Sequence, residues 1–313
     1  MSAGAAFGKV ILLGEHAVVH GVPAIAVGID RGARATAIAL PSGPSLLTVS
    51  PWAADVREDG DTDLARALRA VVEASGQGPA RVEATADLPP GGGLGCSAAL
   101  GVAIARALDP HATDAQAIER ATAWERVFHG QPSGIDATVA AIGSAIVFRK
   151  GQGWERLAFD GELLLCVGHS GIASSTRAMV ELVSRQLERR PEVVRKTFDG
   201  IHALVDNARA ALALGDRAAL GKLMDLNQML LAGLMLSTEE IERMCDLARG
   251  AGALGAKLTG AGGGGSVVAV APSRAVGEQV VGAWTAAGFP GGFVAAVRAH
   301  PQPKVGAGAE SSP

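Results

Sequence analysis

The chain has 313 residues, enough for a sizeable hydrophobic core and for two domains. Its net charge of −3, without a basic run, argues against nucleic acid as the main partner. Its three cysteines, Cys96, Cys166 and Cys245, lack a framework spacing, as is typical of a reducing compartment. No signal peptide is evident, and no uncharged apolar run approaches the roughly 20 residues that span a bilayer. We therefore expect a soluble, cytoplasmic protein without membrane contact.

The first half of the chain predicts strands interleaved with a few helices. Strands are expected at residues 8–13, 24–29, 34–40, 45–49, 80–86 and 144–148. Helices are expected at 61–75, from 96 onward, from 113 to about 129, and briefly from about 136. Asp61 or Thr62 can cap the first of these, and Thr113 the third.

The second half is mostly helical. Helices are expected at residues 175–189, 192–214, 217–236, 238–251 and 273–287, and strands at 163–167, 266–271 and 292–297. Ser237 and Glu240 have the spacing of a capping box for the helix at 238–251. This irregular mixture of strands and helices favours an α+β class over a regularly alternating parallel sheet.

Residues 88–100, LPPGGGLGCSAAL, carry the strongest local signal. Two prolines oppose a helix before Gly91, and glycines at 91–93 and 95 allow dihedral angles and close backbone approach that a Cβ would hinder. From Cys96 onward the apolar spacing is helical. A glycine loop leading into a helix N-terminus offers unpaired N–H groups and the positive end of the helix dipole. The loop is therefore predicted to bind phosphate, with a plain turn as the alternative.

Other phosphate motifs are excluded. The loop lacks the Lys and Ser/Thr that end a P-loop. A GxGxxG pattern occurs at Gly260, Gly262 and Gly265, but residues 266–271 predict a strand where a dinucleotide-binding fold needs a helix. A protein kinase would need HRD and DFG sequences, which are absent. Residues 257–265 are thus a second glycine-rich loop, and the two loops indicate a nucleotide held from two sides.

Several polar residues near these segments also have ordinary structural explanations. Lys9 can be a solvated strand end, and Glu125 can lie on the solvated face of a helix. Asp136 can be an N-cap, although the Ser–Gly turn before it would hold its carboxylate rigidly. His16 and His20 have the i, i+4 spacing of a zinc pair, but no third ligand follows.

Three segments resemble the signature motifs of the GHMP kinases, a family of small-molecule kinases. They are GKVILLGEHAVVHGVPAIA at 8–26, LPPGGGLGCSAAL at 88–100 and KLTGAGGGGSVVAV at 257–270. Their order and separation also fit, so the resemblance covers nearly the whole chain. Within the family, GEHAVVHG, the HGQPSGID stretch at 129–136 and residues 174–177 resemble the mevalonate kinase branch.

The resemblance implies a two-domain α+β fold with the active site in the cleft between the domains. The first domain would comprise residues 1–157 with the first two motifs, and the second residues 158–300 with the third. Residues 301–313 would be a disordered tail. The implied reaction is ATP- and Mg²⁺-dependent phosphorylation of the C5 hydroxyl of mevalonate, in isoprenoid precursor biosynthesis. A homodimer is left open. The alternatives are a phosphomevalonate kinase, another GHMP kinase or, remotely, a non-catalytic kinase-like binding protein.

The resemblance also assigns roles by motif. Asp136 matches the catalytic base, and Lys9 the lysine beside it, which would favour the alkoxide and stabilise charge on the transferred phosphoryl group. Ser97 and Glu125 match the magnesium ligands. The residues expected to hold the nucleotide are Pro90, Gly91, Gly92, Gly93, Leu94, Gly95, Cys96, Ser97, Gly262 and Gly263. Those expected to contact mevalonate are Glu15, His16, Thr176 and Gly262.

Cys96 departs from the family pattern, which has a serine there. Its N–H is retained and Ser97 keeps its hydroxyl, so phosphate and metal binding are expected to persist. The thiol is expected to make the site sensitive to thiol reagents. The chain is also shorter than animal mevalonate kinases, which leaves open whether prenyl diphosphates inhibit it.

Overall fold

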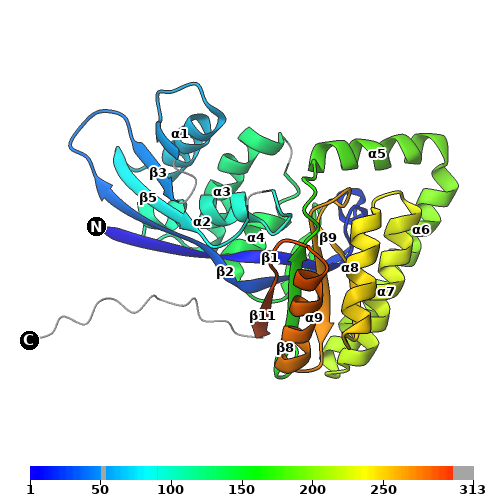
Figure 1. Ribbon diagram of the computed structural model, residues 1–313. Coiled ribbons are helices and arrows are strands. Elements are labelled where there is room, and N and C mark those ends of the chain that lie inside the picture. Colours follow the sequence, from blue (N-terminus) through cyan, green and yellow to red (C-terminus); the bar gives the residue numbers. More distant parts are fainter. Residues whose placement is uncertain (51–53, 90, 131, 299–313) are drawn as a thin grey trace, which may run out of the picture.

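The computed structural model describes residues 1–50, 54–89, 91–130 and 132–298 (Figure 1). Strands between residues 2 and 156 form one sheet, and strands between residues 162 and 298 form another. Helices accompany both sheets, which confirms the mixed α+β class. The predicted tail at 301–313 and Pro90 of the first glycine loop lie outside the described residues.

The first sheet has the strand order β4-β3-β5-β2-β6-β7, and β1 pairs with β2. Its pairings are antiparallel except for β3 with β5, which is parallel. The strands are β1 (Ser2–Leu13), β2 (Ala24–Ala39), β3 (Leu46–Ser50), β4 (Ala54–Arg57), β5 (Ala80–Ala86), β6 (Ile146–Arg149) and β7 (Gly153–Arg156). The short edge strands β4 and β7 were not predicted, because each has only four residues, too few for a strand pattern to stand out.

The strands β1 and β2 are longer than the sequence predicts. Two strands were expected at 24–29 and 34–40, but β2 runs through the polar residues between them because it pairs with β1 along this length. Gly32 makes this approach possible, since a Cβ there would lie 1.9 Å from the Ala6 carbonyl oxygen. Likewise, a Cβ on Gly4 would lie 2.2 Å from Ala103 O, so β1 contacts a helix backbone directly. Pairing and close packing therefore extend strands whose own β propensity is low.

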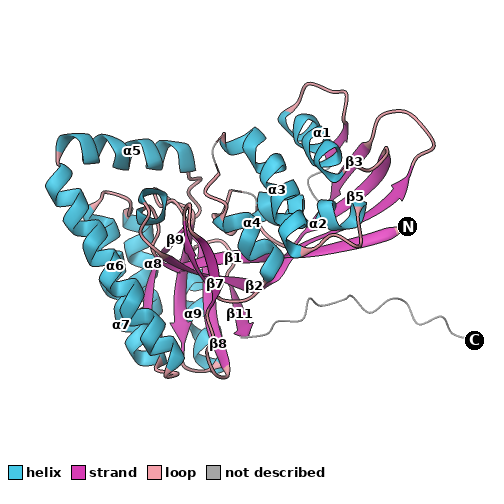
Figure 2. Cartoon of the chain, turned by 180° about the vertical axis from the view of Figure 1, so that it is seen from behind, coloured by secondary structure: helices cyan, strands magenta, loops and turns pink. Residues whose placement is uncertain are grey.

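The helices α1 (Asp63–Ser75), α2 (Cys96–Leu108) and α4 (Ile135–Ile142) pack against this sheet, and α3 (Asp114–His129) packs against these three helices (Figure 2). The single-turn helix η1 (Ala17–His20) follows β1. Thr62 is the N-cap of α1, and Thr113 makes a capping box with Gln116 at the start of α3. Both caps confirm positions that the sequence marked.

The second sheet is antiparallel with the order β11-β8-β10-β9. Its strands are β8 (Glu162–His169), β9 (Gly255–Thr259), β10 (Ser266–Ala271) and β11 (Phe293–Arg298). The helices of this half are α5 (Thr176–Arg189), α6 (Pro191–Ala213), α7 (Arg217–Gly233), α8 (Glu239–Gly250) and α9 (Arg274–Ala286) (Figure 1). None of the helices in the described ranges has both the length and the apolar character needed to cross a membrane.

The predicted capping box at the start of α8 is wrong. Thr238 is the N-cap, and its side chain accepts a hydrogen bond from the Ile241 N–H. Ser237 instead accepts a hydrogen bond from the buried amide of Gln228 at 2.9 Å. A buried amide needs a partner, and this tertiary demand outweighs the local spacing of Ser237 and Glu240.

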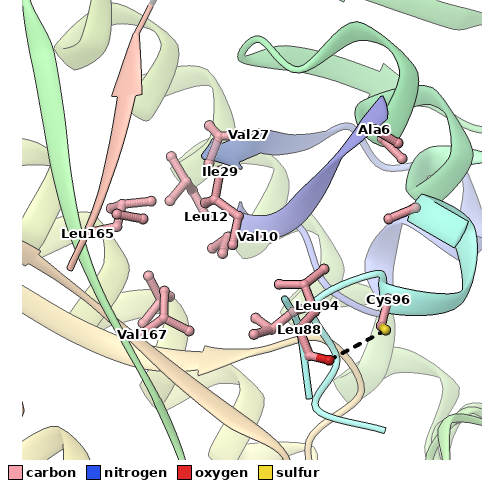
Figure 3. Packing of buried hydrophobic residues seen from close by; sticks show 14 of the residues in the cluster. Ala6, Val10, Leu12, Val27, Ile29, Leu88, Leu94, Cys96, Leu165 and Val167 are labelled. Atoms are coloured by element: carbon pink, nitrogen blue, oxygen red, sulfur yellow. Dashed lines mark hydrogen bonds between the residues drawn. The ribbon is translucent and has the colours of Figure 1, made fainter. Parts of the chain in front are cut away.

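The buried core is continuous across both halves. Figure 3 shows the side chains of Leu165 and Val167 on β8 facing those of Val10 and Leu12 on β1, with Leu88 and Leu94 of the first glycine loop beside them. Apolar contact therefore holds the end of β1 and the glycine loop against the second sheet, and this contact positions the site described next.

Candidate active site

A cavity of about 860 Å³ lies between the two halves, near the upper end of the range for small-molecule sites. Both glycine loops line it. So do the following residues that the sequence marked for a role: Lys9, Glu15, His16, Gly91, Gly92, Gly93, Gly95, Cys96, Ser97, Glu125, Asp136, Thr176 and Gly262. Two marked residues, Leu94 and Gly263, do not line the cavity. The structure thus brings together residues that are up to about 250 positions apart in the chain.

The first glycine loop turns sharply into α2. Gly91, Gly93 and Gly95 have φ between 71° and 74°, a left-handed conformation that favours glycine. Gly95 is the N-cap of α2 and provides no side chain to bond the first N–H groups of the helix. These donors and the positive end of the helix dipole point toward a site for an anion. Leu94 contributes through its backbone, since its carbonyl accepts the Lys9 N–H at 2.8 Å while its side chain lies in the core (Figure 3).

Lys9 and Asp136 form an ion pair at the cavity wall. Lys9 Nζ lies 2.6 Å from Asp136 Oδ1 and donates a hydrogen bond to Gly93 O at 3.3 Å. Lys9 is only 4% exposed, so it is not a solvated strand end. Asp136 lies in the first turn of α4, whose N-cap is Gly134 and not Asp136. A cation, a carboxylate and the glycine loop therefore meet at one point.

Ser97 and Glu125 lie side by side in the same wall. The Ser97 hydroxyl donates to Glu125 Oε1 at 2.5 Å, and the Trp124 indole N–H donates to Ser97 Oγ at 3.2 Å. Burial raises the pKa of Glu125 to about 7, and the hydrogen bond from Ser97 only partly offsets this. A nearby cation would stabilise the ionised carboxylate.

The chemistry of this pair fits Mg²⁺. A hydroxyl and a carboxylate are hard oxygen donors, and Mg²⁺ commonly takes one or two carboxylates together with phosphate oxygens and water. No group of three or more His, Cys, Asp or Glu side chains in the described ranges is arranged to hold a metal by itself. A cation at Ser97 and Glu125 would therefore depend on a phosphate ligand for its remaining oxygens.

His16 and Glu15 come from the turn after β1. Burial lowers the pKa of His16, and its Nε2 lies 2.7 Å from Ala261 O. Because a carbonyl oxygen only accepts, Nε2 carries the hydrogen, and the neutral ring keeps Nδ1 as an acceptor. His20 instead stacks on the ring of Phe198, 5.0 Å away, so the two histidines do not converge as a zinc pair.

Glu15 forms a fully buried ion pair with Lys257 of β9 in the other half. Lys257 also donates to Leu258 O, and the Asn227 amide donates to Glu15 Oε2 at 3.3 Å. Burial raises the pKa of Glu15 and lowers that of Lys257, while the attraction between them acts against both shifts. This pair fixes the turn that carries His16.

Several hydrogen bonds hold the second glycine loop to its own half, in addition to the contact of Ala261 O with His16. The N–H groups of Gly263 and Gly265 donate to Leu236 O and Ile172 O, and the Ser174 hydroxyl donates to Gly262 O. Gly263 has its N–H occupied, and a Cβ there would meet Met179 and not the cavity. The structure thus gives no support to Gly263 as a nucleotide contact. The strand β10 directly follows the loop, which confirms that the GxGxxG pattern is not a dinucleotide motif.

The segment at 174–177 closes the cavity from the second half. Ser175 is the N-cap of α5, and Thr176 in its first turn lines the cavity. Arg177 also lines the cavity but is 90% exposed and pairs with Glu181 at 3.0 Å. Thr176 is therefore placed where its hydroxyl can reach a bound molecule.

Sequence reasoning missed two residues of this site. Lys257 was noted only as the start of a glycine-rich loop, although a lysine within the apolar strand β9 is itself a signal for a buried partner. Trp124 gave no signal, because its indole reaches Ser97 only through the packing of α3 on α2.

The expected sensitivity of Cys96 to thiol reagents is not supported. Cys96 is buried, and its Sγ lies 3.6 Å from Leu88 O (Figure 3). Burial, together with the Glu125 carboxylate, raises the pKa of the thiol to about 12. The thiolate, which is the reactive form, is therefore scarce near neutral pH.

We predict that thiol reagents modify Cys96 slowly in the folded protein. All three cysteines are buried and their pKa values are raised to about 12 by burial. The measurement is the rate of labelling with a chromogenic disulfide at pH 8, compared between native and denaturant-unfolded protein. Labelling of native Cys96 as fast as in the unfolded chain would contradict this prediction.

We predict that Lys257→Met destabilises the fold by about 3–5 kcal/mol, because it leaves the Glu15 carboxylate buried without a partner. The double variant Glu15→Gln, Lys257→Met should recover part of this loss. Chemical denaturation measures both. As a control, Arg177→Met breaks an exposed ion pair and should change stability little. If Lys257→Met and the double variant were destabilised equally, the unpaired Glu15 carboxylate would not be the cause of the lost stability.

Comparison with known proteins places these features in a family. The description "GHMP kinases N terminal domain" matches residues 63–144, and "GHMP kinases C terminal" matches residues 208–290. The chain is 34% identical to the mevalonate kinase of Pyrococcus abyssi, over 85% of this chain and 87% of that protein. It is 36% identical to the mevalonate kinase of Thermococcus gammatolerans, over 90% and 91%.

Among solved structures, the L. major mevalonate kinase in complex with R-mevalonate is similar to this one. Its TM-score is 0.84 at 30% identity, covering 95% of this chain and 96% of that chain. Sequence and fold thus agree along nearly the whole length. The chain belongs to the GHMP kinase family.

Proposed function

We propose that this chain transfers the γ-phosphoryl group of ATP to the C5 hydroxyl of (R)-mevalonate. The observation that carries the proposal is the Lys9–Asp136 pair, 2.6 Å apart, at the edge of a glycine loop that opens into the N-terminus of α2. A carboxylate to take a hydroxyl proton and donors for phosphate are the parts that such a transfer needs. The similarity to mevalonate kinases supports this choice of acceptor.

Asp136 is the proposed base, which accepts the proton of the C5 hydroxyl as the phosphoryl group is transferred. Lys9, held between Asp136 and Gly93 O, lowers the energy of the developing alkoxide and of negative charge on the phosphoryl oxygens. Because Lys9 is buried, its charge is screened little by water. Catalysis then rests on positioning and charge neutralisation.

Ser97 and Glu125 are the residues that would hold Mg²⁺. When bound with ATP, Mg²⁺ neutralises charge on the phosphate oxygens. The loop at 91–97 receives the phosphates through its backbone N–H groups, and Gly262 faces them from the second half. Leu94 is proposed only as part of the backbone of this loop.

The proposed contacts to mevalonate are His16, Glu15, Thr176 and Gly262. His16 Nδ1 is an available acceptor for a substrate hydroxyl, and Thr176 offers a hydroxyl from the opposite wall. Among the described residues, the Lys and Arg side chains that line the cavity are Lys9 and Arg177, and each already has a carboxylate partner. This small number of cations favours mevalonate over an acceptor that is already phosphorylated.

We propose residues 1–157 and 158–300 as the two domains, since the two sheets divide between 156 and 162. A cytoplasmic location is proposed from the cysteine pattern of the sequence. A homodimer is left open as an option.

The test of the reaction is ADP release from the purified chain with ATP and Mg²⁺ and one acceptor at a time. We expect release with (R)-mevalonate and background levels with 5-phosphomevalonate, galactose and homoserine. If ADP were released with 5-phosphomevalonate and with none of the other acceptors, the chain would be a kinase but mevalonate would not be its acceptor. No release with any acceptor, despite ATP binding, would favour a non-catalytic binding protein.

We predict that Asp136→Asn lowers turnover by about 10³-fold or more while ATP binding is retained, because the base is lost and the phosphate loop is untouched. Turnover is measured by coupled ADP release, and nucleotide affinity by titration calorimetry. Asp206→Asn, at an exposed position on α6, is the matched control and should behave like the parent. Near-normal turnover of Asp136→Asn would refute its role as the base.

A further inference from the structure

The indole of Trp124 lies against the Ser97 hydroxyl in the cavity wall. Trp124 precedes Glu125 on α3, is 1% exposed, and donates its Nε1–H to Ser97 Oγ at 3.2 Å. Ser97 lies in the first turn of α2. One helix thus supplies both the carboxylate and the indole that contact the same hydroxyl.

The position of the indole is fixed by close packing. A Cβ on Gly101 would lie 2.9 Å from Trp124 Cδ1 and 3.0 Å from its Cγ, so the ring occupies the space that a side chain on α2 would take. The ring of Phe128 also packs against the indole, tilted by 57° with 5.6 Å between centroids. The N–H therefore points at Ser97 with little freedom to turn away.

The hydrogen bonds of Ser97 determine what its oxygen can still do. A serine hydroxyl has one hydrogen to donate and two lone pairs that accept. The hydrogen is donated to Glu125 Oε1, and one lone pair accepts the Trp124 N–H. One lone pair remains, on the same oxygen that borders Glu125 in the cavity. Without the indole, the hydroxyl of a serine in a first helical turn can rotate to bond nearby backbone groups.

We propose that Trp124 is a positioning residue for the cation site, holding the Ser97 hydroxyl so that its remaining lone pair faces a divalent cation held by Ser97 and Glu125. This inference rests on the proposed function, because that function assigns Mg²⁺ to these two residues. Trp124 acts through Ser97 and touches neither substrate nor phosphate in this role. Outer partners of this kind typically change metal affinity by about 10–100-fold when they are removed.

The test replaces Trp124 by Phe, which keeps an aromatic ring over Gly101 and removes the N–H. Binding of Mn²⁺, a spectroscopic substitute for Mg²⁺, is measured by electron paramagnetic resonance on the protein with ADP. We expect Mn²⁺ affinity to fall by about tenfold or more, with ADP affinity in the absence of metal unchanged. In the kinase assay the Mg²⁺ concentration at half activity should rise while the KM for mevalonate stays constant.

Trp284→Phe is the matched control. Trp284 is fully buried in the second half and its Nε1–H donates to Met244 O at 2.8 Å, so the variant removes the same group away from the cavity. It should lower thermal stability to a similar degree and leave Mn²⁺ affinity unchanged. Gly101→Ala is a second variant, since its methyl group must displace the indole while the N–H is retained. It should also weaken Mn²⁺ binding.

Two results with the variants would overturn the proposal. One is Mn²⁺ affinity of Trp124→Phe and Gly101→Ala within a factor of two of the parent. The other is an equal loss of affinity in Trp284→Phe, which would show general loosening of the fold. Failure of the parent to bind Mn²⁺ with ADP would also reject it. Because binding is read without the acceptor, a chain that binds Mn²⁺ and ADP but does not phosphorylate mevalonate would refute the proposed acceptor and leave this inference standing.

Discussion

The ion pair between Glu15 and Lys257 joins the two halves of the chain, and Glu15 also lines the cavity. Neither side chain is exposed, so both charges depend on each other and on the bonds from Asn227 and to Leu258 O. Burying two charges is costly, and this cost is offset only when the geometry and the remaining hydrogen bonds are good. The pair therefore specifies one way of docking β9 against the turn after β1, and the positions of His16 and both glycine loops follow from that docking.

Further polar contacts near this ion pair also join the two halves of the chain. Thr259, two residues after Lys257, both accepts from the Ile11 N–H and donates to Ile11 O, at 3.0 and 3.1 Å. Ser266 donates to Gly92 O at 2.6 Å, which ties the first glycine loop to β10. Thr259 and Ser266 are both buried, so water does not compete for these bonds. Buried hydrogen bonds of this kind give the interface a single register, because a displaced partner would leave polar groups unpaired.

Two neighbouring pairs of side chains in the first half line the cavity and differ in their chemistry. Lys9 and Asp136 form a compact ion pair close to the glycine loop, suited to a proton and to developing negative charge. Ser97 and Glu125 form a pair of oxygen donors, with His129 Nε2 3.7 Å from Glu125 Oε2. Burial raises the pKa of Glu125 to about 7, although Lys9 acts against this shift. The Asp136 carboxylate is in direct contact with an ammonium group, whereas the Glu125 carboxylate contacts a hydroxyl and a histidine, so Glu125 is the better placed of the two for a bound cation.

The sequence by itself determined the α+β class, most helices to within a few residues and the positions of both glycine loops. The family resemblance marked 16 residues for the site, and 13 of them line the cavity. The class, the helices and the loops are local features, because they depend on side-chain period, on capping residues and on glycines that need positive φ. Only the tertiary structure decided the length of β2, the cap of α8, the inert environment of Cys96 and the roles of Lys257 and Trp124. Each of these depends on a particular tertiary partner: β1 for β2, Gln228 for Ser237, Leu88 for Cys96, Glu15 for Lys257 and Ser97 for Trp124. Local patterns carry no information on such contacts, since burial and pairing arise only when the helices, strands and loops pack together.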